Sequence, residues 1–198
     1  MKTLTNERIA EIAKEFRIDP AALLAVKEVE SGGSGFWPNG RAKILFEGHI
    51  FYQLLSKLTT QARINQLCRD FPNIVYPTWN RNKYKGGLGE YSRLGQAIKI
   101  NKDLAYQSAS YGLFQIMGMN YALCGCSSVE EFVDKMNTSE EEQLKLTIKF
   151  LYKKDLIKTL NSKNFASFAR AYNGPGYAKN NYDVKLMNAY KKYREIYK

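Results

Sequence analysis

Glu30 lies at a position on a predicted helix that could raise the pKa of its carboxyl group. It lies in the stretch AVKEVESGGSGFWPNG (residues 25–40), at the end of a helical pattern and shortly before a Gly-Gly pair. In a helix, Glu30 shares a face with Leu23 and Val26, the face expected to turn toward the core. Partial burial and the negative C-terminal end of a helix both raise the pKa of a carboxyl group. Glu30 could then hold a proton near neutral pH and act as a general acid, but the spacing also fits an ordinary glutamate at a frayed helix end.

Two later segments contain residues of the kinds that shape a binding site. SASYGLFQIMG (residues 108–118) sets Gly112, Gln115 and Gly118 among aromatic and aliphatic residues. FARAYNGPGYAKNNY (residues 168–182) ends a predicted helix at Tyr172 and Asn173 and then turns on Gly-Pro-Gly. Taken singly, the first segment fits a piece of core and the second a helix stop. The order of all three segments along the chain is more informative.

That order, E-S-G-G, then S-Y-G-L-F-Q-I-M, then A-Y-N-G-P-G, resembles the lysozyme-like superfamily of goose-type lysozymes and lytic transglycosylases. The blocks VKEVESGGSGF, ILFEGHIFY, SASYGLFQIMGMNY and FARAYNGPGYAKNNYDVKL are most similar to the N-acetylmuramidase domain of phage and prophage endolysins. The resemblance runs from about residue 20 to residue 190. It implies an α+β, predominantly helical, lysozyme-like fold with a small β element beside a saccharide cleft. It also implies cleavage of the β-1,4 bond between N-acetylmuramic acid and N-acetylglucosamine in peptidoglycan.

The resemblance also assigns expected roles to single residues. Glu30 matches the catalytic acid of the superfamily, and Gly112, Leu113 and Gln115 match the block that lines the cleft floor. Tyr172 and Asn173 match the tyrosine-asparagine pair beside the catalytic glutamate. The transglycosylases usually carry Met-Gln where this chain has Phe114 and Gln115, a departure that favours the muramidase branch. The resemblance implies no cofactor and no metal. The residues expected to bind substrate are Ser31, His49, Ser110, Gly112, Gln115, Tyr172 and Asn173.

Glycoside hydrolysis usually needs a second carboxyl group, and Glu47 is the candidate. It follows the strand-like Ile44–Phe46 segment and precedes Gly48, where the chain turns. Seventeen residues separate it from Glu30, the same gap as between the two carboxylates of lysozyme. Glu47 could instead be a structural glutamate bonded to the local backbone or to His49. A transglycosylase needs no second carboxylate, because a hydroxyl of the substrate closes a ring.

Other residues near these segments allow weaker predictions. His49 is the single histidine, without the partners of a nucleophilic triad, so we expect it to support Glu47 or to pack nearby. Loop aromatic residues could stack on sugar rings or belong to small satellite cores. These aromatic residues are Phe36, Trp37, Trp79 and Tyr84.

Composition limits the class of protein. The chain has 198 residues, is 44% hydrophobic and carries a formal net charge of +11, so it can bury a core and is attracted to polyanions. An odd number of cysteines, Cys68, Cys124 and Cys126, with no CxxC pair argues against a disulfide scaffold and a zinc site. Cys124 and Cys126 are expected to be small packed side chains. No run is long and apolar enough to span a membrane, and the first residues do not form a signal peptide.

A helix-turn-helix reading of residues 6–31 fails on side-chain chemistry. The second helix, PAALLAVKEVE, offers two glutamates where a DNA-reading helix needs Arg, Asn, Gln or Ser. We therefore expect no nucleic-acid partner. The positive charge would instead favour anionic wall or lipopolysaccharide.

Apolar spacing and capping signals predict a mostly helical chain. Asp19 and Pro20 supply an N-cap and a first-turn proline for a helix that ends near Ser31. Residues 70–90 are rich in Pro, Asn and Gly and predict an exposed excursion. Further helices are expected near residues 6–16, 90–107, 128–137, 139–153, 163–172 and 180–197. We expect one domain over residues 1–198, without a separate wall-binding domain, and a monomer.

The C-terminal segment has an amphipathic pattern. Aromatic and aliphatic residues recur in steps of three and four from Tyr182 to Tyr197, with Lys and Arg mostly off that stripe. The stripe is expected to pack on the domain, although a basic amphipathic helix of this kind could also insert into a membrane surface.

The function expected from these features is that of an endolysin that hydrolyses peptidoglycan and lyses bacteria. The alternatives are a lytic transglycosylase that forms 1,6-anhydro products and, from another class, a non-catalytic wall-binding module. Without a signal peptide, such a protein would stay in the host cytoplasm until a holin releases it to the periplasmic wall. The alternative is an effector delivered by another secretion route.

Overall fold

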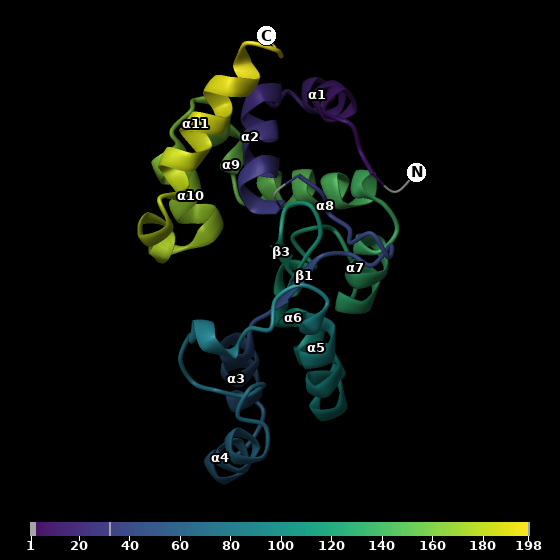
Figure 1. Cartoon of the computed structure of the whole chain (residues 1–198), viewed down its shortest axis with the longest axis vertical. Helices are drawn as coiled ribbons and strands as arrows, with labels where there is room; N and C mark the ends of the chain where they lie inside the picture. The colour runs from purple at the N-terminus through teal and green to yellow at the C-terminus, as the bar shows by residue number, and fades with distance from the viewer. Residues whose placement is uncertain (1–2, 32, 198) are drawn as a thin grey trace.

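The computed structural model describes residues 3–31 and 33–197, apart from the side chains of Ser31 and Pro175. Helices make up most of the chain and surround a small sheet (Figure 1). The α-helices, in chain order, are α1 (Asn6–Glu15), α2 (Pro20–Ser31), α3 (Gly48–Ser56), α4 (Gln61–Asp70), α5 (Gly89–Ile100), α6 (Lys102–Gln107), α7 (Val129–Met136), α8 (Glu140–Lys153), α9 (Leu156–Asn161), α10 (Phe165–Asn173) and α11 (Tyr182–Arg194). Short 3-10 helices are η1 (Arg81–Lys83), η2 (Gly118–Asn120) and η3 (Pro175–Asn180).

The N-terminal cap expected for α2 is present. The Asp19 carboxylate accepts a hydrogen bond from the Ala22 amide at 3.0 Å, and Pro20 opens the helix. Helix α2 is also the centre of the core, because every side chain from Ala21 to Val26 is 1% exposed or less. A helix buried so fully holds the residues at its end in a fixed place.

The sheet is small and antiparallel, with strand order β1-β2-β3. Its strands are β1 (Ile44–Phe46), β2 (Ala109–Tyr111) and β3 (Ile116–Met117). Ile44 pairs with Tyr111 and Phe46 pairs with Ala109, so the β2–β3 turn lies at the Ile44 end of β1. Figure 1 shows the strands between one group of helices containing α1, α2 and α11 and another containing α3, α4 and α5.

The C-terminal helix packs on the domain, as its stripe predicted. Helix α11 lies along α2 (Figure 1), with Leu186, Ala189 and Tyr193 buried. Glu28 of α2 accepts hydrogen bonds from Lys192 and from the Tyr193 hydroxyl, both at 2.7 Å. The tyrosines thus contribute apolar rings to the contact and hydroxyl groups to polar partners.

Several elements differ from the sequence-based expectation. Helices α4 and α9 were not predicted, and the helix predicted over 90–107 is two helices, because the Asn101 side chain caps α6 through the Leu104 amide at 3.0 Å. Strands β2 and β3 are three and two residues long, too short to show an alternating pattern.

The cysteines are free, and Cys124 and Cys126 are buried as expected of packed side chains. Burial raises the pKa of the Cys124 thiol to about 12. Within the described ranges, no helix combines the length and the apolar character needed to cross a bilayer.

Candidate active site

Glu30 lies in the last turn of α2 and is half-buried. The Asn173 side-chain amide, at the end of α10, donates a hydrogen bond to Glu30 Oε1 at 2.8 Å. Burial raises the pKa of Glu30 to about 7, and the Asn173 hydrogen bond opposes this rise only in part. The carboxyl group is therefore poised to hold and release a proton near neutral pH, as a general acid must.

Tyr172 connects this glutamate to the sheet. Its hydroxyl donates to the Phe114 carbonyl in the β2–β3 turn at 2.7 Å. Its ring stacks on Phe168 with centroids 5.2 Å apart, and it meets Phe150 edge-on at 5.8 Å. Because Tyr172 and Asn173 are consecutive, the packing of α10 sets both the β2–β3 turn and the partner of Glu30.

The β2–β3 turn uses most of its polar groups internally. Gly112 and Gln115 both have positive φ, +74° and +48°, which makes the turn tight. The side-chain Nε2 of Gln115 donates to the Gly112 carbonyl at 2.8 Å, and its Oε1 accepts from the Ser110 hydroxyl at 2.8 Å. Ser110 itself is only 6% exposed. The structure thus brings these three predicted residues together, and the contacts it shows for them fix the turn.

Helix α8 holds the loop that follows α2 and the β2–β3 turn. Buried Gln143 accepts from the Leu113 amide and donates to the Met136 carbonyl, both at 2.7 Å. Buried Glu140 accepts from the Gly35 amide at 2.7 Å. Sequence reasoning missed this support, because Glu140 looks like part of an ordinary acidic first turn. The only available signal was that Gln143 and Thr147 share the helix face that carries the core residues.

The Gln143 contacts make a stability prediction. Gln143→Leu keeps the volume of the side chain but leaves the buried Leu113 amide and Met136 carbonyl unpaired, at a cost of about 1–3 kcal/mol each. We expect the free energy of unfolding to fall by about 3 kcal/mol, measured by urea denaturation. Gln96→Leu, on the exposed face of α5, is the matched control and should change it by less than about 0.5 kcal/mol. Equal stability of the two variants would contradict the assigned role.

Glu47 follows β1 and occupies the N-cap position of α3, with its side chain 17% exposed. Its amide donates to the Ser108 carbonyl at 2.8 Å, which continues the β1–β2 ladder by one step. The Tyr84 hydroxyl donates to Glu47 Oε2. Burial raises the pKa of Glu47, while the Tyr84 hydrogen bond and the Arg93 charge lower it.

His49 lies beside Glu47, as expected. Its Nδ1 is 3.3 Å from Glu47 Oε2, and its ring stacks on Tyr76 at 6.5 Å. Burial lowers the pKa of His49, so the imidazole is neutral near pH 7 and the approach is not a charged pair. Gly48, between the two, has no room for a side chain, because a Cβ there would overlap the Tyr76 ring and the Ile74 carbonyl. This crowding explains why the residue between Glu47 and His49 is a glycine.

Glu47 and the turn to which Glu30 is linked lie at opposite ends of the same sheet. Glu30 is linked through Tyr172 and Asn173 to the β2–β3 turn, beside Ile44. Glu47 follows the other end of β1, three residues later, or about 10 Å at the strand rise of about 3.3 Å per residue.

The remaining residues singled out in the sequence differ in how far they are exposed. Ser31 ends α2, but its side chain is outside the described part of the structure. Phe36 is buried, so its ring belongs to the core, and Trp37 is half-buried. Trp79 is 61% exposed, and its ring centroid is 6.4 Å from that of Tyr84. Among the described residues, no group of three or more His, Cys, Asp or Glu side chains is arranged to bind a metal ion.

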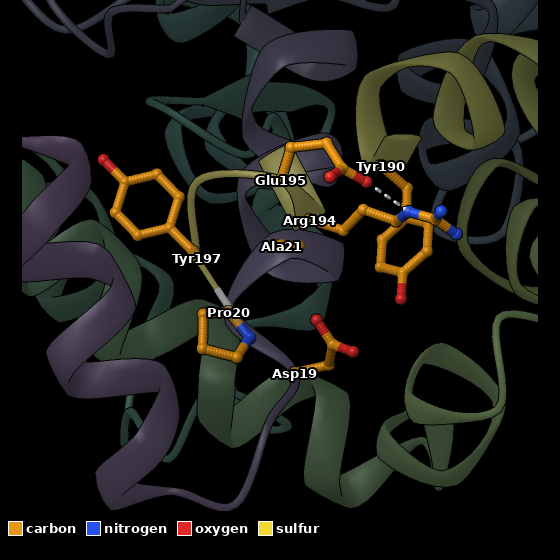
Figure 2. Close-up of a pocket in the computed structure, with 7 residues that line it drawn as sticks. All are labelled: Asp19, Pro20, Ala21, Tyr190, Arg194, Glu195 and Tyr197. Carbon is orange, nitrogen blue, oxygen red and sulfur yellow. Dashed lines mark hydrogen bonds and ion pairs between the residues drawn. The ribbon is translucent and has the colours of Figure 1, made fainter. Parts of the chain in front are cut away.

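A separate cavity of about 460 Å³ lies far from these residues. Figure 2 shows it between the start of α2, at Asp19 and Pro20, and the end of α11, at Tyr190 and Arg194. Glu30 is at the other end of α2, about 16 Å away along the helix axis at 1.5 Å per residue. Neither candidate carboxylate lines the cavity, so it is not the candidate active site.

Comparison with known proteins gives a family match and a similar solved structure. The N-acetylmuramidase family matches residues 19–194 of the chain. No curated protein matches it. Among solved structures, the crystal structure of the Burkholderia AP3 phage endolysin superposes with a TM-score of 0.84 at 39% sequence identity, covering 98% of this chain and 73% of that one.

Proposed function

Because the chain belongs to the N-acetylmuramidase family of glycoside hydrolases, we propose that it cleaves the β-1,4 bond between N-acetylmuramic acid and N-acetylglucosamine. Its similarity to a phage endolysin over 98% of its length supports the function of a peptidoglycan-hydrolysing endolysin that lyses bacteria. The observation that carries the catalytic assignment is the half-buried carboxyl of Glu30, whose pKa is raised to about 7.

Glu30 is the general acid in this proposal. It gives its proton to the glycosidic oxygen as the bond from that oxygen to the anomeric carbon breaks, and the leaving sugar departs with a neutral hydroxyl. Asn173, which donates to Glu30 Oε1, stabilises the carboxylate that remains. Tyr172 keeps Asn173 in place through the packing of α10.

Glu47 is the second carboxylate in this proposal. It either takes a proton from the attacking water or forms a bond to the anomeric carbon, and in both cases it must be ionised when the reaction starts. A role in binding sugar remains a prediction for the other residues, which are Ser31, His49, Ser110, Gly112, Gln115, Tyr172 and Asn173.

The products distinguish hydrolysis from transglycosylation. Mass spectrometry of digested peptidoglycan should show fragments 18 Da heavier than 1,6-anhydro fragments, because water adds across the cleaved bond. Reducing ends support the proposed hydrolysis. Predominant 1,6-anhydro ends would show that the substrate's own hydroxyl attacks and that Glu47 is not needed.

The proposal extends to partners and place of action. The net charge of +11 favours contact with anionic envelope components such as lipopolysaccharide, and no nucleic-acid partner is proposed. We propose a monomer of one domain that is made in the host cytoplasm and reaches the wall through a holin.

The two carboxyl groups predict a bell-shaped pH profile. Glu30 acts only when protonated, so kcat/KM should fall about tenfold for each pH unit above its pKa of about 7. The acidic limb should reflect protonation of Glu47. The measurement is the release of soluble fragments from purified peptidoglycan between pH 4 and pH 10 at constant ionic strength. Constant activity up to pH 9 would exclude Glu30 as the acid.

A further inference from the structure

Tyr84 lies in the connection between α4 and α5 and contacts Glu47 across 37 residues of sequence. Its hydroxyl donates to Glu47 Oε2, and its ring faces the Arg93 guanidinium at 5.3 Å. Burial and the nearby Glu47 raise the pKa of Tyr84, so the hydroxyl keeps its proton throughout the working pH range. Tyr84 is therefore a permanent donor to Glu47.

A buried ion pair fixes the backbone on which both residues sit. Arg93 and Glu90 of α5 contact each other at 2.6 Å, with side chains 1% and 0% exposed. Glu90 accepts from the Phe46 amide at 3.2 Å and from the Lys85 amide at 2.7 Å, and Arg93 donates to the Phe46 carbonyl at 2.7 Å. Phe46 directly precedes Glu47, and Lys85 directly follows Tyr84. The Glu90–Arg93 pair thus holds the backbone next to both Glu47 and Tyr84.

We propose that Tyr84 is a positioning residue for Glu47, aligned by the buried Glu90–Arg93 pair, and that it turns one carboxylate oxygen toward the substrate. The Tyr84 hydroxyl and His49 Nδ1 both approach Oε2. No hydrogen bond within the described part of the chain goes to Oε1, which is therefore the oxygen available for water or the anomeric carbon. This inference rests on the proposed role of Glu47.

The groups around Glu47 predict what loss of the hydroxyl does. Tyr84 and Tyr76 face it from the α4–α5 connection, His49 from α3, and Glu90 and Arg93 from α5. The Tyr84 hydrogen bond lowers the pKa of Glu47 against the effect of burial. Without it, the carboxylate loses a donor that only its charged form needs, and it protonates at higher pH.

The test is the pH profile of Tyr84→Phe with purified peptidoglycan. We expect kcat/KM at the optimum to fall and the acidic limb to move up by about one pH unit, the value of one hydrogen bond to a charged group. The alkaline limb, set by Glu30, should stay in place. Tyr91→Phe is the matched control, because the hydroxyl of this half-buried tyrosine of α5 also donates a hydrogen bond, to the Ala42 carbonyl at 2.7 Å. It should leave both limbs unchanged.

A second readout does not depend on activity. In protein labelled with ¹³C at the glutamate carboxyl groups, the Glu47 signal, assigned by its absence in Glu47→Gln, should titrate at higher pH in Tyr84→Phe. An unchanged acidic limb and an unchanged Glu47 titration would overturn the inference and leave Tyr84 a structural residue. Full activity of Glu47→Gln would instead refute the proposed role of Glu47 itself, which separates the two failures.

Discussion

Glu30→Gln is expected to lower the rate of wall cleavage by about a thousandfold, within the 10²–10⁴ range of general acid catalysis. Glutamine has nearly the same shape, and its oxygen can still accept the hydrogen bond that Asn173 donates at 2.8 Å. The change therefore removes the proton and little else. The measurement is the initial rate of fragment release from purified peptidoglycan at pH 6, with circular dichroism to confirm the fold.

Glu28→Gln is the control for this variant. Glu28 lies two residues earlier on α2 and faces α11, where it accepts from Lys192 and Tyr193. Its loss should cost some stability and leave the rate per folded molecule close to that of the parent. Retention of more than a tenth of the parent rate by Glu30→Gln would remove Glu30 from the proposed mechanism.

Glu30→Gln should also be more stable than the parent protein at alkaline pH. The pKa of Glu30 is raised from 4.5 to about 7, so the folded state favours the protonated carboxyl. That contribution to stability is complete below about pH 4.5 and is lost as the pH rises through 7. At about 1.4 kcal/mol per pH unit, the difference reaches about 3 kcal/mol. Melting temperatures of the two proteins should therefore agree near pH 4 and diverge by pH 8.

Glu47→Gln is expected to lower the rate by about a hundredfold or more. The glutamine oxygen can still accept from Tyr84, so the position of the side chain is kept while its charge is lost. Neutral glutamine neither takes a proton from water nor attacks a sugar. Release of reducing ends from purified peptidoglycan measures the loss.

Glu142→Gln, a half-buried glutamate of α8 paired with Lys145, is the control for removal of one negative charge. Its effect on the rate should be within about twofold, since it lies in neither the sheet nor the Tyr84 contact. A near-normal rate for Glu47→Gln, accompanied by 1,6-anhydro products, would assign the protein's chemistry to ring closure by the substrate.

Local signals in the sequence predicted where the Glu30 side chain lies, and the family resemblance supplied its expected role. The spacing of Leu23, Val26 and Glu30 put the glutamate on the inner face of a helix, and the glycines that follow marked its end. Burial of α2 and the raised pKa of Glu30 agree with both inferences. Family resemblance supplied Asn173, whose contact with Glu30 spans 143 residues and has no local signal.

The support of the second carboxylate was not predictable in the same way. In the sequence, Glu90 and Arg93 look like an ordinary surface pair one turn apart on a helix. In the structure both side chains are fully buried against β1. Tyr84 read as one of several loop aromatic residues. Their roles depend on how the α4–α5 connection folds back on Phe46, which is a property of tertiary packing.

The surroundings of Glu30 are completed by residues that are synthesised long after α2. A ribosome releases α2 long before α10, so the nascent chain carries Glu30 for the time needed to translate the 143 residues between them. Closing a loop of that length is an entropically costly step that follows local helix formation. Until Tyr172 and Asn173 reach Glu30, the burial that raises its pKa is incomplete. An unfinished chain that lacks α10 therefore lacks neighbours that surround Glu30 in the complete fold.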